Sequence, residues 1–494
     1  MRFPIVRRAL LLLALAVPLV ATGPAASRSS QPQGWDSDLA LPVAADLNPD
    51  PHILEINLEA RIQDIEILPG KRTAVWSYNG GLPGPLIRLV VGDRLIVHFT
   101  NNLPEETTIH WHGLRLPNAM DGAPGVTQPA VAANGGVFTY DFVVPDAGTF
   151  WYHPHSNSGA QLSRGLYGPM LVTDPHDPPA FGEDLVLMLS DISLNSEGQI
   201  NPANEGTYLG DLFGREGNIL LVNGKVRPAL KVRQGQPQRW RIINAARARF
   251  FTLDYGQAPF VKLGGDDGLA AAARRVTAVR IVPGERADVV FIPQDRPGAR
   301  GVLRWLPTER GPGSTFNRLT EDLMTIETVR ERAVRAPRIR SALRTIAPID
   351  TAGARQRDIA LTIRQRPDGS MEMGINGVPH DKAPPLVAHV GDTEVWTVRN
   401  DTSFAHPFHL HGFFFQVLDP ARVPEWKDTA EVPAKTTLRL AVHFDRPGLW
   451  MFHCHILDHA DAGMMGQIRV LAAGEAPGGG AVAHQGMRGA ATTP

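Results

Sequence analysis

Three stretches of the chain carry apolar residues with strong β preference, and turn signals bound each of them. They cover residues 94–99, 238–243 and 393–398. Each begins shortly after a glycine and ends just before an asparagine that follows this glycine by nine positions. The three copies carry Asn-Gly at 79–80, 223–224 and 376–377, glycine at 92, 235 and 391, and asparagine at 101, 244 and 400. Apolar runs bounded by Gly and Asn are typical of strands. The spacing therefore predicts three copies of one β-rich unit.

The repeat predicts an all-β protein built from antiparallel β-sandwiches of Greek-key type. A chain of 494 residues is too long for one hydrophobic core. Its 48 Gly and 42 Pro suit the frequent turns of sandwiches. We expect an export signal at about 1–27, sandwich domains at 45–175, 176–335 and 336–473, and a disordered Gly/Ala-rich tail at 474–494. Helical patterns are few, and residues 319–332 are one candidate.

The N-terminus has the pattern of an export signal. Arg2, Arg7 and Arg8 precede an apolar run at 9–21, and small residues follow. The run is too short to cross a bilayer comfortably, and no later segment resembles a membrane span. Arg7-Arg8 is either a twin-arginine signal or part of an ordinary secretory signal. We expect a periplasmic or secreted protein without a membrane span in its mature form.

The charge balance excludes a polyanionic partner. Forty-nine basic residues stand against 50 acidic ones, so nothing in the composition favours a nucleic acid. We expect the chain to be a monomer that does not bind nucleic acid.

The chemistry concentrates around the only cysteine of the chain, Cys454. His453 and His455 flank it, and His459 and Met464 follow. One cysteine excludes an intramolecular disulfide. Thiolate, imidazole and a weak thioether together suit copper, as in blue electron-transfer sites. A lone buried Cys is more often an inert small hydrophobe, but four potential ligands beside it favour a metal site.

Ten of the 17 histidines form four clusters at matching offsets in the outer repeats. The clusters are His110 and His112, then His153 and His155, then His406, His409 and His411, and finally His453, His455 and His459. The middle repeat has Leu253, Tyr255, Leu303 and Trp305 at the corresponding positions. We therefore expect the middle domain to lack metal ligands and to act as a spacer and structural wall.

The alternation of a strand allows one short segment to serve two sites. Residues two apart point to the same face, so His453 and His455 share a face while Cys454 points to the other. Eight histidines are too many for one copper but can hold three between the outer domains. Cys454, His406, His459 and Met464 remain for a separate copper. A single buried histidine pair is often only a core feature, but burying eight imidazoles without partners is costly.

The four histidine motifs resemble those of the three-domain multicopper oxidases of bacterial type. Their order and spacing match over residues 50–472. This family includes laccases, bilirubin oxidases and cuprous oxidases. The resemblance implies cupredoxin-like domains and four copper ions. It assigns the type 1 copper to His406, Cys454, His459 and Met464, the type 2 copper to His110 and His409, one type 3 copper to His112, His153 and His455, and the other to His155, His411 and His453. Cys454, His453 and His455 then form the electron path between the sites.

The resemblance also concerns the carboxylates that deliver protons. Residues 121–128 resemble the family's segment after the first histidine pair, and Asp121 matches one acid position. An alternative for Asp121 is a purely local role in the turn at Gly122. The acid of cuprous oxidases after the second type 1 histidine is replaced by Ala460, and Asp458 or Asp461 could substitute.

The resemblance implies a copper-dependent oxidoreductase that couples one-electron oxidation of a donor to four-electron reduction of O2. We expect laccase-like donors, phenols and aromatic amines. An alternative is oxidation of Cu(I), Fe(II) or Mn(II) for copper homeostasis, for which Met371 and Met373 would be a sparse capture site. A copper store is a further alternative. A hypothesis of another class is a non-catalytic cell-envelope or division protein of the same fold, but such relatives lack ligand residues. The natural donor stays open.

Overall fold

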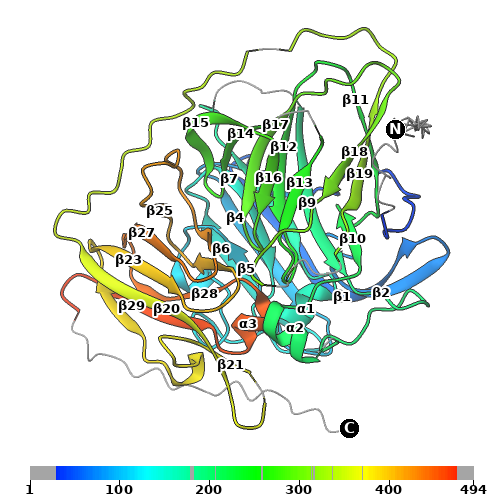
Figure 1. Ribbon diagram of the computed structural model, residues 1–494. Helices are drawn as coiled ribbons and strands as arrows, with labels where there is room; N and C mark the ends of the chain where they lie inside the picture. The colour runs from blue at the N-terminus through cyan, green and yellow to red at the C-terminus, as the bar shows by residue number, and fades with distance from the viewer. Residues whose placement is uncertain are drawn as a thin grey trace, which may run out of the picture.

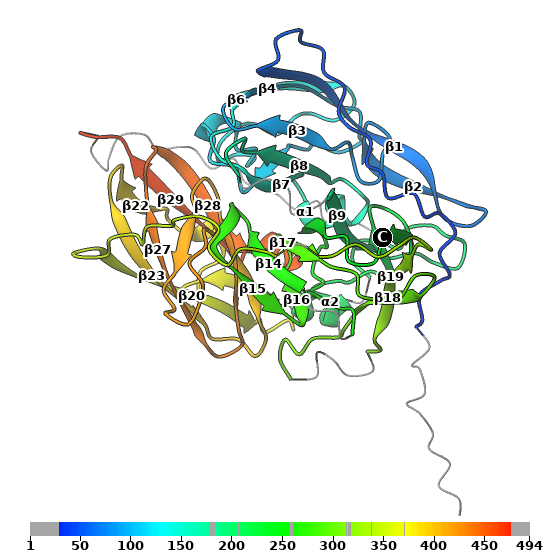
Figure 2. The same cartoon turned by 90° about the horizontal axis from the view of Figure 1, so that it is seen from above.

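The computed structural model describes residues 29–475 except 178–182, 206, 257–259, 313, 315–317, 337 and 370. The signal predicted at 1–27 and all but the first two residues of the tail predicted at 474–494 lie outside these residues. The described residues form six β-sheets, as the sequence predicts for an all-β protein. They form three pairs, seen as a blue to cyan, a green and a yellow to red group in Figure 2.

The first sandwich pairs sheet β2-β1-β4-β6 with sheet β3-β8-β7-β5. Its strands are β1 (Ile53–Leu68), β2 (Lys71–Tyr78), β3 (Ile87–Val90), β4 (Arg94–Asn101), β5 (His110–His112), β6 (Gly136–Val143), β7 (Gly148–His153) and β8 (Gly168–Thr173). Side chains from both sheets form one buried cluster that includes Phe99, Trp111 and Tyr152. β5 runs antiparallel to β7, and His110 lies opposite His153.

The second sandwich pairs sheet β10-β9-β12-β17-β14-β15 with sheet β11-β19-β18-β13-β16. Its strands are β9 (Glu183–Ile192), β10 (Ile219–Val222), β11 (Ala229–Val232), β12 (Gln238–Asn244), β13 (Phe251–Asp254), β14 (Phe260–Gly265), β15 (Gly268–Val276), β16 (Ala278–Ile281), β17 (Arg286–Phe291), β18 (Arg300–Trp305) and β19 (Glu321–Thr328). Leu253 lies opposite Trp305, and both are core residues. Apolar side chains thus fill the positions that carry histidines in the outer repeats.

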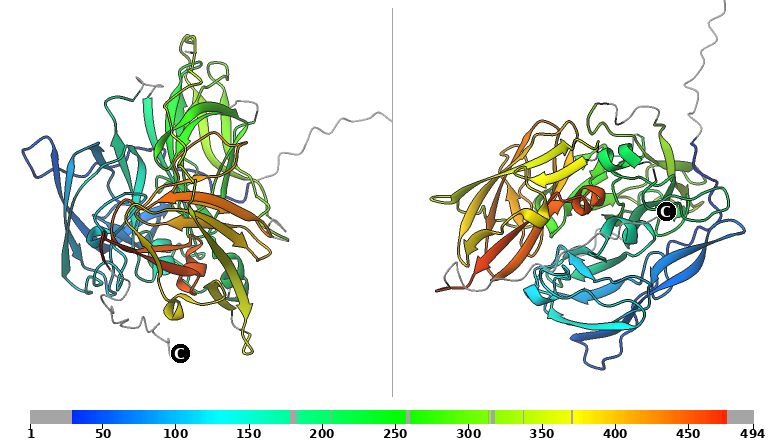
Figure 3. Two further views of the ribbon diagram at one scale, coloured as in Figure 1. Left: turned by 90° about the vertical axis from the view of Figure 1, so that its left-hand side faces the viewer. Right: turned by 90° about the horizontal axis from the view of Figure 1, so that it is seen from below.

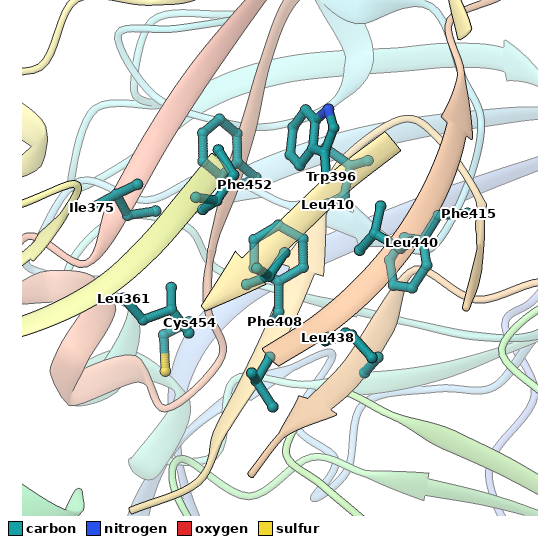
Figure 4. Packing of buried hydrophobic residues seen from close by; sticks show 14 of the residues in the cluster. Leu361, Ile375, Trp396, Phe408, Leu410, Phe415, Leu438, Leu440, Phe452 and Cys454 are labelled. Atoms are coloured by element: carbon teal, nitrogen blue, oxygen red, sulfur yellow. The ribbon is translucent and has the colours of Figure 1, made fainter. Parts of the chain in front are cut away.

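The third sandwich pairs sheet β21-β20-β23-β27-β25 with sheet β22-β29-β28-β24-β26. Its strands are β20 (Arg355–Gln365), β21 (Met371–Ile375), β22 (Leu386–His389), β23 (Thr393–Asn400), β24 (His406–Leu410), β25 (Phe415–Val417), β26 (Thr429–Val432), β27 (Thr437–His443), β28 (Gly448–Cys454) and β29 (Met465–Leu471). Figure 4 shows its core around Trp396, Phe408 and Phe452. Met373 is fully buried in this core, so this methionine is a packing residue.

The helices in the described residues are short. They are α1 (Ser158–Ser163), α2 (Thr207–Phe213), α3 (Leu457–Asp461) and the 3₁₀ turns η1 (Asn118–Met120) and η2 (His380–Lys382). None of these helices has the length and apolar character that a bilayer crossing requires. α3 lies beside α1 and α2 where the three sandwiches meet (Figures 1 and 3).

The three sequence repeats have one structural role. Asn79, Asn223 and Asn376 adopt left-handed conformations with φ of 53°, 50° and 54°. Each is followed by a glycine of positive φ, as tight hairpin turns require. The later asparagines, Asn101 and Asn400, are buried and donate their side-chain amide to three carbonyl oxygens each. The repeat therefore marks a hairpin turn and a buried polar brace.

The helix predicted for residues 319–332 is wrong. This segment contains strand β19, which pairs antiparallel with β18 and parallel with β11. Leu323, Met324 and Ile326 are buried within it. Sheet pairing on both sides overrides the local helical pattern, because it satisfies the backbone and buries these side chains at the same time.

Candidate metal centres

Eight buried histidines meet between the first and third sandwiches. They come from β5, the end of β7, β24 and β28, and from the residues that follow these strands, and they are His110, His112, His153, His155, His409, His411, His453 and His455. The ring of His110 stacks on His411 at 3.9 Å between centroids, and His112 stacks on His409 at 3.9 Å. The rings of His155 and His453 lie 5.4 Å apart. The seam therefore gathers histidines from both outer sandwiches, as the sequence predicts.

Several ring nitrogens in this group have no hydrogen-bond partner. Among the described buried side chains, they are Nε2 of His110, His153 and His409, Nδ1 of His112 and both nitrogens of His455. The second nitrogen of His110 donates to the carbonyl of Asp121 at 2.8 Å, and that of His153 donates to Pro154 at 2.9 Å. A buried polar nitrogen without a partner is costly, whereas a metal ion satisfies it. The free nitrogens therefore fit the donor set of a metal cluster.

The donor nitrogens fall into groups small enough to hold metal ions. Three groups have their ligand atoms within 4.8 Å of one another: His110, His409 and His411; His110, His112 and His153; and His155, His411 and His453. The rings of His455 lie 4.9 Å from His112 and 5.5 Å from His153. His110 and His409 lie together, as a type 2 pair requires. His155, His411 and His453 are the residues that the resemblance assigns to one type 3 copper, whereas the group of His110, His112 and His153 mixes residues that it assigns to two coppers.

Burial keeps seven of these imidazoles neutral by lowering their pKa. Desolvation lowers the pKa of His110, His112, His153, His411, His453 and His455 well below the usual range, and lowers that of His155 to about 4. A neutral imidazole has a lone pair for a metal, so the cluster is ready to bind cations without first releasing protons.

A second donor group lies on the other side of β28. The sulfur of Cys454 lies 3.3 Å from Nδ1 of His406 and 3.5 Å from Nδ1 of His459, and these two nitrogens are 3.2 Å apart. All three side chains are fully buried. Met464 is buried in the same core, and its carbonyl accepts a hydrogen bond from the amide of Cys454 at 3.1 Å. One thiol and two imidazoles thus converge as in a mononuclear copper site.

Strand β28 separates the two groups. His453 lies opposite His409, and Cys454 lies opposite Phe408 in the core of the third sandwich. Figure 4 shows Cys454 at one end of this core, with its sulfur directed away from Trp396 and Phe452. Nδ1 of His453 also donates to the carbonyl of Cys454 at 3.0 Å. The two sites are therefore joined by peptide bonds and by one hydrogen bond.

Asp121 reaches the cluster directly. Its Oδ2 lies 2.9 Å from Nδ1 of His411, and its Oδ1 lies 3.5 Å from Nδ1 of His110. Burial raises the pKa of this carboxyl to about 8. Asp121 is 1% exposed, so its role extends beyond the turn at Gly122.

The other predicted acids make different bonds. The carboxylate of Asp458 is held by Arg215 and Arg247, and Asp461 accepts the amide of Gly159 in α1 at 2.8 Å. Ala460 packs with Ala123, Met451 and Met465 in an apolar cluster. The position that holds a second acid in cuprous oxidases is therefore apolar in this chain. Asp458 and Asp461 bond to arginines and to a backbone amide and not to the cluster histidines.

Asp428 is a cluster carboxylate that sequence reasoning missed. Its Oδ1 lies 3.2 Å from Nε2 of His112 and 3.4 Å from Nδ1 of His409. Arg286, from β17 of the middle sandwich, binds the same carboxylate with both terminal nitrogens and keeps its pKa well below the usual range. The only sequence signal is a charged pair, Lys427-Asp428, just before a short strand.

Helix α2 covers the thiolate site. Nε2 of His459 donates to the carbonyl of Leu212 at 3.1 Å, and the ring of Phe213 lies 5.4 Å from Phe404. Phe404 in turn lies 5.1 Å from the ring of His406. Neither imidazole has exposed surface. The middle sandwich therefore contributes the cover of this site, although it contributes none of the predicted ligands.

Comparison with known proteins gives a consistent result. Residues 59–177 and 353–474 each match a family described as multicopper oxidase. Multicopper oxidase MmcO from Mycobacterium tuberculosis is 31% identical over 466 residues, which covers 85% of this chain and 86% of that protein. A laccase from Bacillus subtilis is 27% identical and covers 80% of this chain and 89% of that protein. Among solved structures, the multicopper oxidase from Campylobacter jejuni, described as a metallo-oxidase, has a TM-score of 0.79 at 29% identity and covers 90% of this chain and 96% of that one.

Proposed function

This chain belongs to the multicopper oxidase family, and on that premise we propose that it oxidises phenols or aromatic amines at a type 1 copper and reduces O2 at a three-copper cluster. Members of the family are copper-dependent oxidoreductases. When bound, copper supplies the one-electron steps and the four-electron reduction of O2 to water. One observation carries the proposal: strand β28 directs Cys454 to two imidazoles on one side and His453 to the cluster on the other.

The proposed ligand division is the one that the family resemblance implies. His110 and His409 would hold the type 2 copper, and Nε2 of each is free to bind it while Nδ1 of each is bonded to a carbonyl. His112, His153 and His455 would hold one type 3 copper, and His155, His411 and His453 the other. Cys454, His406, His459 and Met464 would hold the type 1 copper. This division requires four ions.

The surrounding residues orient the ligands and exclude water. Backbone carbonyls fix the tautomer of His110, His153 and His409, so that the free nitrogen of each faces the cluster. Asp121 hydrogen-bonds to His411 and is the proposed proton donor, since its raised pKa lets it hold a proton near neutral pH. Burial of all eight rings keeps competing solvent away from the cluster.

The donor is the open part of the proposal. The aromatic rings of Phe213 and Phe404 beside the type 1 group favour an apolar, aromatic donor. The alternative, oxidation of Cu(I), Fe(II) or Mn(II), is favoured by the complete burial of both type 1 imidazoles, because a small ion needs less open surface than a phenol. Met373 is a core residue, which leaves Met371 as the single remaining candidate from the methionine pair.

The cellular location and the oligomeric state of the enzyme are also proposals. The pattern at 1–27 suits export to the periplasm or the medium, where the mature chain would act as a monomer. A non-catalytic role is disfavoured, since all twelve proposed ligands are retained.

The test is an oxygen-consumption assay on the copper-loaded protein with a phenol and with Cu(I) in parallel, and with Cys454→Ser as the control. Oxygen uptake with the phenol at the higher kcat/KM supports the proposal. Uptake with Cu(I) alone would replace it by the metal-ion alternative. A protein that binds copper but consumes no oxygen with either donor would contradict both.

A further inference from the structure

Arg286 is a fully buried arginine at the start of β17 in the middle sandwich. Its Nη1 donates to Asp428 Oδ1 at 2.8 Å and to the carbonyl of Gly284 at 3.0 Å. Its Nη2 donates to Asp428 Oδ2 and, at 3.3 Å, to the carbonyl of Asp266. Its Nε donates to the carbonyl of Thr149 in the first sandwich at 2.8 Å. A single guanidinium therefore joins all three sandwiches.

The carboxylate that Arg286 holds is hydrogen-bonded to one proposed copper ligand, His112, and lies 3.4 Å from a nitrogen of a second, His409. Nε2 of His112 lies 3.2 Å from Asp428 Oδ1 and 3.2 Å from Thr429 Oγ1, and this hydroxyl donates to Oδ1 at 2.8 Å. Nδ1 of His409 donates to the backbone carbonyl of Asp428 at 3.0 Å. His112 thus depends on side chains for its orientation, whereas His409 also has a backbone partner.

Two glycines show how tightly this region is packed. A Cβ on Gly113 would lie 2.4 Å from Nη2 of Arg286 and 2.7 Å from Oδ2 of Asp428. A Cβ on Gly284, two residues before Arg286, would lie 2.8 Å from the ring of His455 and 3.0 Å from the ring of His112. Both glycines also have positive φ. The backbone of the middle sandwich is therefore in direct contact with the histidine cluster.

We propose that Arg286 is a positioning residue of the copper cluster, through which the middle sandwich fixes Asp428 and thereby orients His112 and His409. The inference rests on the proposed copper cluster but concerns a residue outside its ligand set. Partners of this kind set the tautomer and direction of metal-binding imidazoles. The bidentate fork of arginine holds a carboxylate in one plane, which a lysine cannot do.

The test compares Arg286→Met with Arg239→Met. Arg239 is a matched control, because it is a buried arginine of the same sheet whose Nε and Nη2 donate to Oδ1 and Oδ2 of Asp288 in β17. Each variant removes an arginine of the middle sandwich that forms a buried ion pair, but only Arg286 reaches the cluster, through Asp428. The readouts are copper equivalents per chain, the blue absorbance of the type 1 site, and the type 2 signal in electron paramagnetic resonance.

We expect Arg286→Met to bind cluster copper about 10–100-fold more weakly while the blue absorbance stays. Arg239→Met should keep its full copper content, and Arg286→Lys should recover only part of the loss. Full copper content in Arg286→Met, or an equal loss in Arg239→Met, would overturn the inference. Should Arg286→Met not fold, Asp428→Asn gives the same comparison, and unchanged copper affinity in it overturns the inference too. Failure of the proposed function would differ, because the wild-type protein itself would then lack the blue absorbance or the cluster copper.

Discussion

Cys454 and His406 are 48 residues apart in the sequence, yet the sulfur lies 3.3 Å from Nδ1 of the imidazole. β24 and β28, which carry them, are antiparallel neighbours in one sheet. The amide of Ile456 also donates to the sulfur at 3.4 Å. Cys454 and His406 therefore meet because of the register in which β24 and β28 pair.

The first prediction concerns Cys454→Ser. We expect this variant to lose the intense blue colour and to lose oxidase activity to the background of the copper-free protein, because both require a copper–thiolate bond. The fold should stay intact, since serine is close to cysteine in size. Visible absorbance, oxygen uptake and circular dichroism are the measurements. A blue or active variant would refute the assignment of Cys454.

The second prediction concerns Met464→Leu. We expect the colour to stay and the type 1 potential to rise, because the weak axial thioether is lost while the stronger ligands remain. Met465→Leu is the matched control, since Met465 packs with Ala123 and Ala460 in a separate apolar cluster. Redox titration followed by absorbance checks both variants. Equal potentials in the two would show that Met464 is not a ligand.

The third prediction concerns the pH dependence of stability in the copper-free protein. The ordinary pKa of an aspartate carboxyl is 3.8, whereas burial raises the pKa of Asp121 to about 8 in the folded chain. Between these values the folded state keeps a proton that the unfolded state has released, so the free energy of unfolding falls as pH rises through this window. Asp121→Asn removes this penalty.

We therefore expect the Tm of copper-free Asp121→Asn minus the Tm of copper-free wild type to be larger at about pH 8.5 than at about pH 5. This difference in Tm should grow by at least about 3 °C between the two pH values. Thermal unfolding followed by circular dichroism at both pH values is the measurement. A difference in Tm that does not change with pH would show that Asp121 is ionised in the folded protein throughout this range.

The fourth prediction concerns α2. Replacing Thr207–Phe213 by a short Gly/Ser linker removes the carbonyl of Leu212 from Nε2 of His459. We expect kcat/KM for bulky phenols to rise several-fold relative to that for a small donor, because the edge of the imidazole becomes accessible. The same replacement at η2 (His380–Lys382) is the control. Unchanged selectivity in the α2 variant would mean that donors reach the site by another path.

The sequence predicted more about the candidate ligands than about the segments that surround them. The strand alternation placed Cys454 and His453 on opposite sides of one strand, and the repeat located the turns at Asn79, Asn223 and Asn376. The helix predicted for 319–332 is wrong, because pairing with β11 and β18 decided the conformation of this segment. The ions held by each histidine and the boundaries of the domains stay predictions.

The sequence by itself determined the inventory of candidate ligands and their alternation along each strand, because the two-residue period is a local property of the backbone. Only the tertiary structure decided that Arg286 binds Asp428 and that Leu212 covers His459. These contacts join residues 142 and 247 positions apart in the sequence. They depend on how whole faces of the sandwiches pack against each other, and no local pattern of polar and apolar residues specifies that choice.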